Sequence, residues 1–175
     1  MNRHVRLGIN IDHVATLRNA RGGDTPKVIE AAKVVEESGA DLITVHVRED
    51  RRHINEKDLG NILDTVNIPV NLEIAANSEM IDIAINYHPK FVCFVPENRK
   101  EITTEGGLDV INNFKELNKV LKSITDTEIN VSIFIDPDKE QIKAVNDLGI
   151  STVEFHTGPY ANAFIKYRNI DKEFK

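Results

Sequence analysis

Short apolar segments alternate along this chain with longer segments in which apolar residues recur at helical spacing. The apolar segments are rich in Val, Ile and Phe and mostly lack strict alternation, which is typical of strands buried on both faces of a parallel sheet. Six of them predict strands at residues 5–11, 41–47, 69–74, 91–95, 130–135 and 152–155. Strands that alternate with helices predict an α/β fold with right-handed crossovers.

Capping and stop residues mark where the helices between these strands begin and end. The predicted helix starts are Thr25-Pro26, Asn55, Asn77 or Ser78, Asp109 and Asp136-Pro137. Gly39 and Gly149 are predicted stops, and a last helix is predicted to start near Ala161.

Two closures of such a sheet compete, an open doubly wound sheet and a (β/α)8 TIM barrel. The first strand lacks a Gly-rich dinucleotide motif, and ionisable residues follow nearly every strand, which favours the barrel. Only about six βα units are found in 175 residues, whereas barrels typically have about 250 residues. We therefore expect residues 1–175 to form a single, incomplete TIM-barrel domain, and we hypothesise a chain truncated by roughly two βα units.

Composition narrows the class of protein. The chain is 41% hydrophobic and 29% charged, as expected of a globular domain. A net charge of -6 argues against nucleic acid as a partner, and no apolar run approaches the roughly 20 residues of a membrane span. The single cysteine, Cys93, permits no disulfide within the chain, and no apolar signal region follows Met1. These features predict a cytoplasmic protein.

The first two strands end in polar groups. Asn10, Asp12 and His13 come at the end of the first strand. His46 and Arg48 share one face of the second, since strand side chains alternate. Packing explains a His and an Arg on the same inner face poorly, so we expect both to enter the cavity beside the third strand. His46 can transfer protons near neutral pH.

Carboxylates end the third and sixth strands. Glu73 is predicted to have a raised pKa and to act as a general base unless a cation pairs with it, the alternative being a structural ion pair. Glu154 and His156 flank Phe155 at the end of the last strand. A divalent metal bound by Asp12, Glu73 and Glu154 is a further alternative, whereas no His/Cys set has zinc spacing.

Cationic residues near these strand ends suit anionic ligands. Arg18 and Arg21 follow the first strand, and Arg48, Arg51 and Arg52 form a second cluster. They predict either phosphate-binding groups or solvated surface charges. His53 lies in the loop that follows the second cluster, and the stretch from Thr103 to Gly107 predicts either a ligand loop with backbone N–H donors or a helix-capping loop.

At these residues the chain resembles the pyridoxine 5′-phosphate synthase family of the deoxyxylulose-dependent vitamin B6 pathway. The matching segments follow one another in order along nearly the whole chain. They are GINIDHVATLRNARGG (8–23), GADLITVHVREDRRHI (39–54), VNLEIA (70–75), VPENRKEITTEGGLDV (95–110), VSIFIDPD (131–138) and VEFHTG (153–158).

The resemblance implies a (β/α)8 barrel, an enzyme of the transferase class, a homo-octamer, small phosphorylated substrates, and no metal or organic cofactor. It implies condensation of 1-deoxy-D-xylulose 5-phosphate with 3-amino-2-oxopropyl phosphate to give pyridoxine 5′-phosphate, phosphate and water. It also implies residue roles: His46 and Glu73 as proton acceptors, Glu154 as transition-state stabiliser, Asn10 and Arg21 on the aminoketone phosphate, and Asp12, His13, Arg48, His53 and Thr103 on the deoxyxylulose phosphate.

Full-length members of that family continue through two more strands, and the turn after the seventh, of Asn-Ala-Gly-His-Gly type, supplies a catalytic His. We therefore expect residues 1–175 to be a poor catalyst. One alternative is a non-catalytic remnant that retains a phosphate-binding or subunit-assembly role. Another is a different barrel lyase or aldolase, although the lack of a Lys at the strand ends disfavours Schiff-base chemistry.

Overall fold

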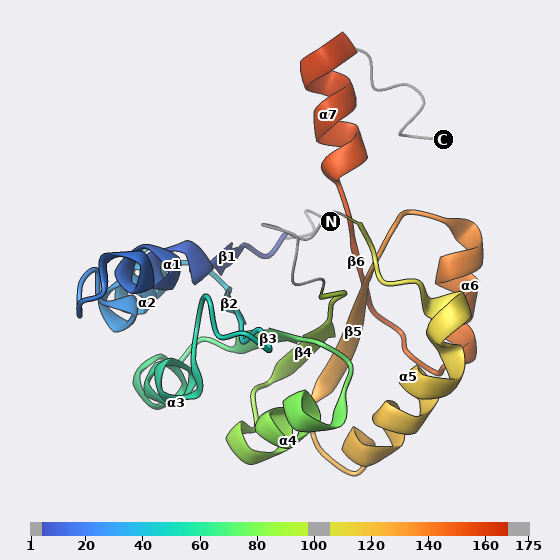
Figure 1. The fold of residues 1–175 in the computed structure, drawn as a ribbon, viewed down its shortest axis with the longest axis horizontal. Helices are drawn as coiled ribbons and strands as arrows, with labels where there is room; N and C mark the ends of the chain where they lie inside the picture. The colour runs from blue at the N-terminus through green and yellow to red at the C-terminus, as the bar shows by residue number, and fades with distance from the viewer. Residues whose placement is uncertain (1–4, 98–105, 168–175) are drawn as a thin grey trace.

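The computed structural model describes residues 5–97 and 106–167, and their strands form one curled parallel sheet (Figure 1). The strands are hydrogen-bonded in sequence order, from β1 to β6. Their bounds are β1 Gly8–Asn10, β2 Leu42–His46, β3 Val70–Ile74, β4 Phe91–Phe94, β5 Asn130–Ile135 and β6 Val153–Phe155. This is a partial (β/α) barrel, so the predicted fold class is confirmed.

Helices cover the outer face of the curled sheet, each beside the next in sequence order from α2 to α6. α7 extends from the end of β6 away from the other helices (Figure 1). The bounds are α1 Asp12–Arg21, α2 Val28–Glu37, α3 Glu56–Thr65, α4 Ser78–Tyr87, α5 Val110–Ile124, α6 Lys139–Asp147 and α7 Gly158–Tyr167. Within the described ranges, no helix is long and apolar enough to span a membrane.

The hydrophobic core lies between the sheet and these helices. Alternate strand residues such as Ile43, Val45, Leu72 and Ile133 point outward into it and are fully buried. The intervening residues therefore face the inside of the curve. Burial of this apolar layer, at about 25 cal/mol per Å², supplies the main driving force for the fold and leaves the inner face available for polar groups.

The register of the sheet brings polar inner-face residues side by side. Thr44 pairs with Asn71, and one step further His46 pairs with Glu73. Glu73 pairs in turn with Cys93 of β4. Since parallel strands end at the same edge, the last residues of these strands gather at one rim of the barrel.

Local capping follows the sequence closely. The Asn55 side chain accepts from the Asp58 N–H in a capping box, and Asn77 and Asp109 cap α4 and α5. Side-chain oxygens of this kind satisfy N–H groups that the first helical turn leaves unpaired. Gly39, at φ 85°, follows the end of α2 in the left-handed conformation that glycine tolerates best.

Four helix starts differ from prediction. α7 begins at Gly158 rather than near Ala161. α2 begins at Val28 rather than at Pro26, and the cis Thr25-Pro26 peptide lies outside the helix. α6 begins after Asp138, whose carboxylate accepts from two N–H groups of the first turn. α1 was not among the predicted helices, since few apolar residues recur in it and only Asp12 and Ala15 are buried.

Candidate active site

The rim of the barrel is organised around His46, the last residue of β2. Its backbone N–H donates to Oδ1 of Asp12 at 2.7 Å. Oδ2 of Asp12 accepts from the Asn10 side-chain amide at 2.8 Å, and Oδ1 of the Asn10 side chain accepts from the backbone N–H of Asp12 at 2.9 Å. The carboxylate at the start of α1 therefore ties the ends of β1 and β2 together. Burial raises the pKa of Asp12, although these hydrogen bonds oppose the rise.

The imidazole of His46 lies between two carboxylates. Nε2 is 2.9 Å from Oε1 of Glu97, and Nδ1 is 3.8 Å from Oε2 of Glu73. The side chains of His46 and Glu97 are each 6% exposed, and that of Glu73 is 15% exposed. Glu97 was not among the predicted site residues. The available signal was a charged residue directly after the fourth buried strand, at the same rim as the others.

Glu73 is held in an environment that favours its protonated form. Burial raises its pKa to about 8, and the nearby charges of Glu154 and Asp12 contribute in the same direction. A raised pKa was predicted for Glu73 unless a cation pairs with it, and Nδ1 of His46, at 3.8 Å, is too far away for a direct hydrogen bond. Glu154 also has a raised pKa, mainly through burial, and it hydrogen-bonds the Cys93 thiol. At neutral pH Glu73 therefore keeps a proton that it can exchange with a neighbour.

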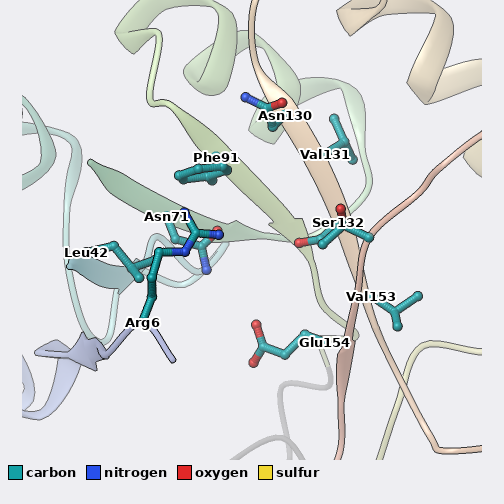
Figure 2. A pocket seen from close by; sticks show the side chains of 10 residues that line it. Arg6, Leu42, Asn71, Phe91, Asn130, Val131, Ser132, Val153 and Glu154 are labelled. Carbon is teal, nitrogen blue, oxygen red and sulfur yellow. The ribbon is translucent and has the colours of Figure 1, made fainter. Parts of the chain in front are cut away.

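Below the rim, the inner face of the sheet encloses an open cavity of about 300 Å³. Figure 2 shows Glu154 and Ser132 on one side of it and Asn71 and Arg6 on the other, with Phe91 between β3 and β5. Polar side chains such as Asn71, Ser132 and Glu154 line it together with apolar ones such as Leu42 and Phe91. The interior of a closed barrel is more often filled by branched apolar side chains. The cavity gives small polar molecules access to the Glu154 carboxylate.

His53 and His13 form a second group at the rim, next to His46. The rings of His13 and His53 meet edge to face with centroids 5.8 Å apart, and the ring of His53 lies 6.2 Å from that of His46. Nδ1 of His53 is 2.6 Å from the Thr16 hydroxyl. Burial, followed by the charges of His46 and Arg48, lowers the pKa of His53 to about 4. His53 is therefore neutral near pH 7, whereas His13 is exposed.

The predicted phosphate-binding arginines divide into two groups. Arg18 makes a two-pronged ion pair with Asp58 at 2.6 and 2.8 Å, and both side chains are largely buried, so Arg18 is a structural partner of Asp58 rather than a solvated surface charge. Arg21 is exposed and lies in the last turn of α1. Arg48 is 2% exposed, with Nε 3.5 Å from Asp50.

The other two arginines of the second cluster are held by acidic neighbours. Arg51 binds Glu56 and Glu79, at 2.7 and 2.8 Å. Arg52 binds Asp50 at 2.6 Å. These ion pairs offset much of the positive charge that the sequence suggests for this cluster.

The loop that follows β4 contains Thr103, which lies outside the described residues. Its C-terminal end is anchored at Gly107, whose N–H donates to Oδ1 of Asp136 at 3.0 Å. The same carboxylate oxygen lies 2.9 Å from Nδ1 of His156. The structure therefore places His156 beside β5 and the loop end rather than beside His46.

Asp12, His46 and Glu73 could also hold a metal ion. Each offers one ligand atom, and these atoms lie within 4.8 Å of one another. The set differs from the alternative suggested by the sequence, because His46 takes the place of Glu154. Both oxygens of Asp12 already accept hydrogen bonds, so a cation would have to displace part of the network that positions His46.

Residues 7–175 match the sequence profile of the family described as "Pyridoxal phosphate biosynthesis protein PdxJ". The chain belongs to this family. The pyridoxine 5′-phosphate synthase of Rhodospirillum rubrum is 50% identical over 163 residues, which cover 93% of this chain and 66% of that protein. The protein of the same name from Idiomarina loihiensis is 52% identical, over 91% of this chain and 66% of its own length. The chain thus spans about two thirds of the length of these curated relatives.

Among solved structures, the fold is similar to that of a mandelate oxidase mutant with a monooxide FMN adduct. The TM-score is 0.63 at 12% sequence identity, over 93% of this chain and 58% of the other. At this identity the similarity concerns the fold alone. It supports the assignment of a PdxJ-family chain to the (β/α) barrels.

Proposed function

We propose that this PdxJ-family chain carries the condensing site of a pyridoxine 5′-phosphate synthase. The reaction joins 1-deoxy-D-xylulose 5-phosphate and 3-amino-2-oxopropyl phosphate and releases phosphate and water. The observation that best supports the proposal is the buried arrangement in which His46 lies between Glu97 and Glu73 at the end of β2. Two carboxylates with pKa values shifted in opposite directions on either side of an imidazole suit repeated proton transfer.

The chemistry needs such groups. An amine and a ketone first form an imine, after which water and phosphate leave and a carbon–carbon bond closes the ring. Each step moves a proton to or from the substrate. In the proposal His46 accepts such protons. Glu73, which is largely protonated near neutral pH with a pKa of about 8, accepts a proton after it has first given its own to the substrate. Glu154, which lies near Glu73, stabilises charge that develops during the reaction.

Two phosphorylated substrates also need polar and cationic contacts. In the proposal the deoxyxylulose phosphate lies near the histidine pair of the rim and near Arg48, and the aminoketone phosphate lies near Arg21. Two observations support these positions. Arg48 is buried next to the histidine pair, and the side chain of Arg21 is exposed. The proposed contacts to the first substrate are Asp12, His13, Arg48, His53 and Thr103, and those to the second are Asn10 and Arg21.

Calorimetry with 1-deoxy-D-xylulose 5-phosphate tests the binding half of this proposal, with inorganic phosphate and unphosphorylated 1-deoxy-D-xylulose as comparison ligands. We expect the phosphorylated sugar to bind at least about 10-fold more tightly than either. Arg48→Lys keeps the charge but loses the planar fork of N–H donors, so it should weaken binding by about 10-fold or more. Arg52→Lys, at a more exposed arginine of the same cluster, is the matched control.

Turnover is tested by release of pyridoxine 5′-phosphate, with the Rhodospirillum rubrum relative as positive control. Release that is lost in Glu73→Gln supports the synthase. Tight binding of the sugar phosphate without release would favour a non-catalytic role that retains the phosphate pocket. If the chain neither binds the sugar phosphate nor releases pyridoxine 5′-phosphate, the proposal is contradicted.

A further inference from the structure

We propose that Glu97 is a positioning residue for His46: it keeps a proton on Nε2 and leaves Nδ1 as the atom that accepts protons. The inference deepens the proposed function, on which it depends for the identity of the proton donor. The arrangement of the imidazole itself can be measured without any substrate. Glu97 lies two residues beyond Val95, whose N–H donates to Ile74 of β3, so the sheet brings it to the same rim.

Both oxygens of Glu97 already have partners. Oε1 lies 2.9 Å from Nε2 of His46, and Oε2 accepts from the backbone N–H of Glu49 at 3.1 Å. Burial opposes ionisation of Glu97, but the hydrogen bonds from the His46 ring and the Glu49 N–H outweigh it, and its pKa is lowered. An ionised carboxylate can only accept. The ring nitrogen that faces Glu97 must therefore carry the proton.

A proton on Nε2 determines the state of Nδ1, the other nitrogen of the ring. A neutral imidazole with its proton on Nε2 has a lone pair on Nδ1, and Nδ1 is 3.8 Å from Oε2 of Glu73. That separation is too long for a direct hydrogen bond. A reacting N–H or C–H group, or a water, between them could transfer its proton to Nδ1. The bond to that proton breaks, the Nδ1–H bond forms, and the positive charge on the ring is stabilised by Glu97.

Two further hydrogen bonds hold the backbone of His46 and the carboxylate of Glu97 in place. The backbone N–H of His46 is held by Asp12, and the Glu97 carboxylate is held by the Glu49 N–H. The arrangement follows the general logic of a base oriented by a carboxylate on its far side. Glu73, whose pKa is about 8, is a poor candidate for this orienting role because it is largely protonated near neutral pH.

The test is the protonation state of the His46 ring nitrogens, read from nitrogen-15 NMR shifts of the full chain at neutral pH. In the wild type we expect a bound proton on Nε2 and an unprotonated Nδ1. In Glu97→Gln the amide can donate as well as accept, so a measurable fraction should move to the form with the proton on Nδ1. Glu97→Asp keeps a carboxylate and should retain most of the wild-type pattern. Glu37→Gln removes an exposed carboxylate at the end of α2, away from the rim, and should change nothing.

A wild-type ring with its proton on Nδ1 would overturn the inference, as would a folded Glu97→Gln variant whose ring signals match the wild type. If Glu97→Gln melts too low to study, the wild-type measurement still decides. In a turnover assay Glu97→Gln should lower kcat by about 10²-fold with little change in KM, with partial recovery in Glu97→Asp. Absence of turnover in the wild type would contradict the proposed synthase but would leave the NMR result valid.

Discussion

Asp12 and His46 lie 34 residues apart in sequence, yet Oδ1 of Asp12 accepts the backbone N–H of His46 in a buried hydrogen bond of 2.7 Å. Removing the acceptor would leave a buried N–H without a partner, which costs about 1–3 kcal/mol. We therefore expect Asp12→Ala to lower the free energy of unfolding by about this amount in urea denaturation. Asp12→Asn keeps a side-chain carbonyl oxygen and should lose less. Equal losses in the two variants would contradict this account.

Glu73 should make the protein less stable as the pH rises. Its pKa is about 8 in the folded state and 4.5 in the reference state, so over this range the folded chain binds more protons than the unfolded chain. The contribution of Glu73 is fully present below about pH 4.5 and is lost as pH rises through 8. Glu73→Gln should remove this dependence and become more stable, relative to the wild type, at about pH 8.5 than at about pH 5. Denaturation curves at both pH values measure the difference.

The same substitution separates a catalytic from a structural role. If Glu73 transfers protons, Glu73→Gln should lower turnover by about 10²-fold or more while folding changes little. If Glu73 is half of a buried ion pair, the variant should instead lose about 3–5 kcal/mol of stability. A large fall in melting temperature with near-normal turnover in the folded fraction would argue against catalysis.

His53 should make the protein sensitive to acid. Its pKa is lowered from 6.5 to about 4 by burial and by the charges of His46 and Arg48. A histidine with a depressed pKa contributes stability that is present above about pH 6.5 and is lost as pH falls towards 4. We expect His53→Gln to lose less stability than the wild type between about pH 7 and about pH 5. His88→Asn, at an exposed histidine in the left-handed conformation that Asn tolerates, is the control.

Gly107 should not tolerate a side chain. A Cβ there would lie 2.0 Å from the backbone nitrogen of Asp136 and 2.3 Å from the carbonyl carbon of Ile135. Because neither backbone can move without disturbing β5, Gly107→Ala should cost about 1–3 kcal/mol. At Gly23 nothing lies within 4 Å of the added Cβ, so Gly23→Ala is the matched control. A Gly107→Ala variant as stable as Gly23→Ala would contradict the close approach.

The sequence determined the order of elements, because each strand is a short apolar run and most helices begin at a side chain that can cap them. Asn55, Asn77 and Asp109 were found as caps from local chemistry alone. It also placed His46 and Glu73 at the rim, since alternation along a strand and the parallel direction of the sheet fix which side chains meet there. The register confirms that these two residues lie opposite each other.

Tertiary structure alone decided how the charges pair. Arg18 and Asp58 are 40 residues apart in sequence. The residues around Arg18 therefore do not reveal whether it pairs with a carboxylate or binds a phosphate. Glu97 likewise reaches His46 across 51 residues. Burial and neighbouring charge, which set the pKa of Glu73 near 8 and that of His53 near 4, depend on which segments pack together. Local pattern fixes where an ionisable group stands on its strand, whereas its proton affinity depends on the solvent and charges that the whole fold brings to it.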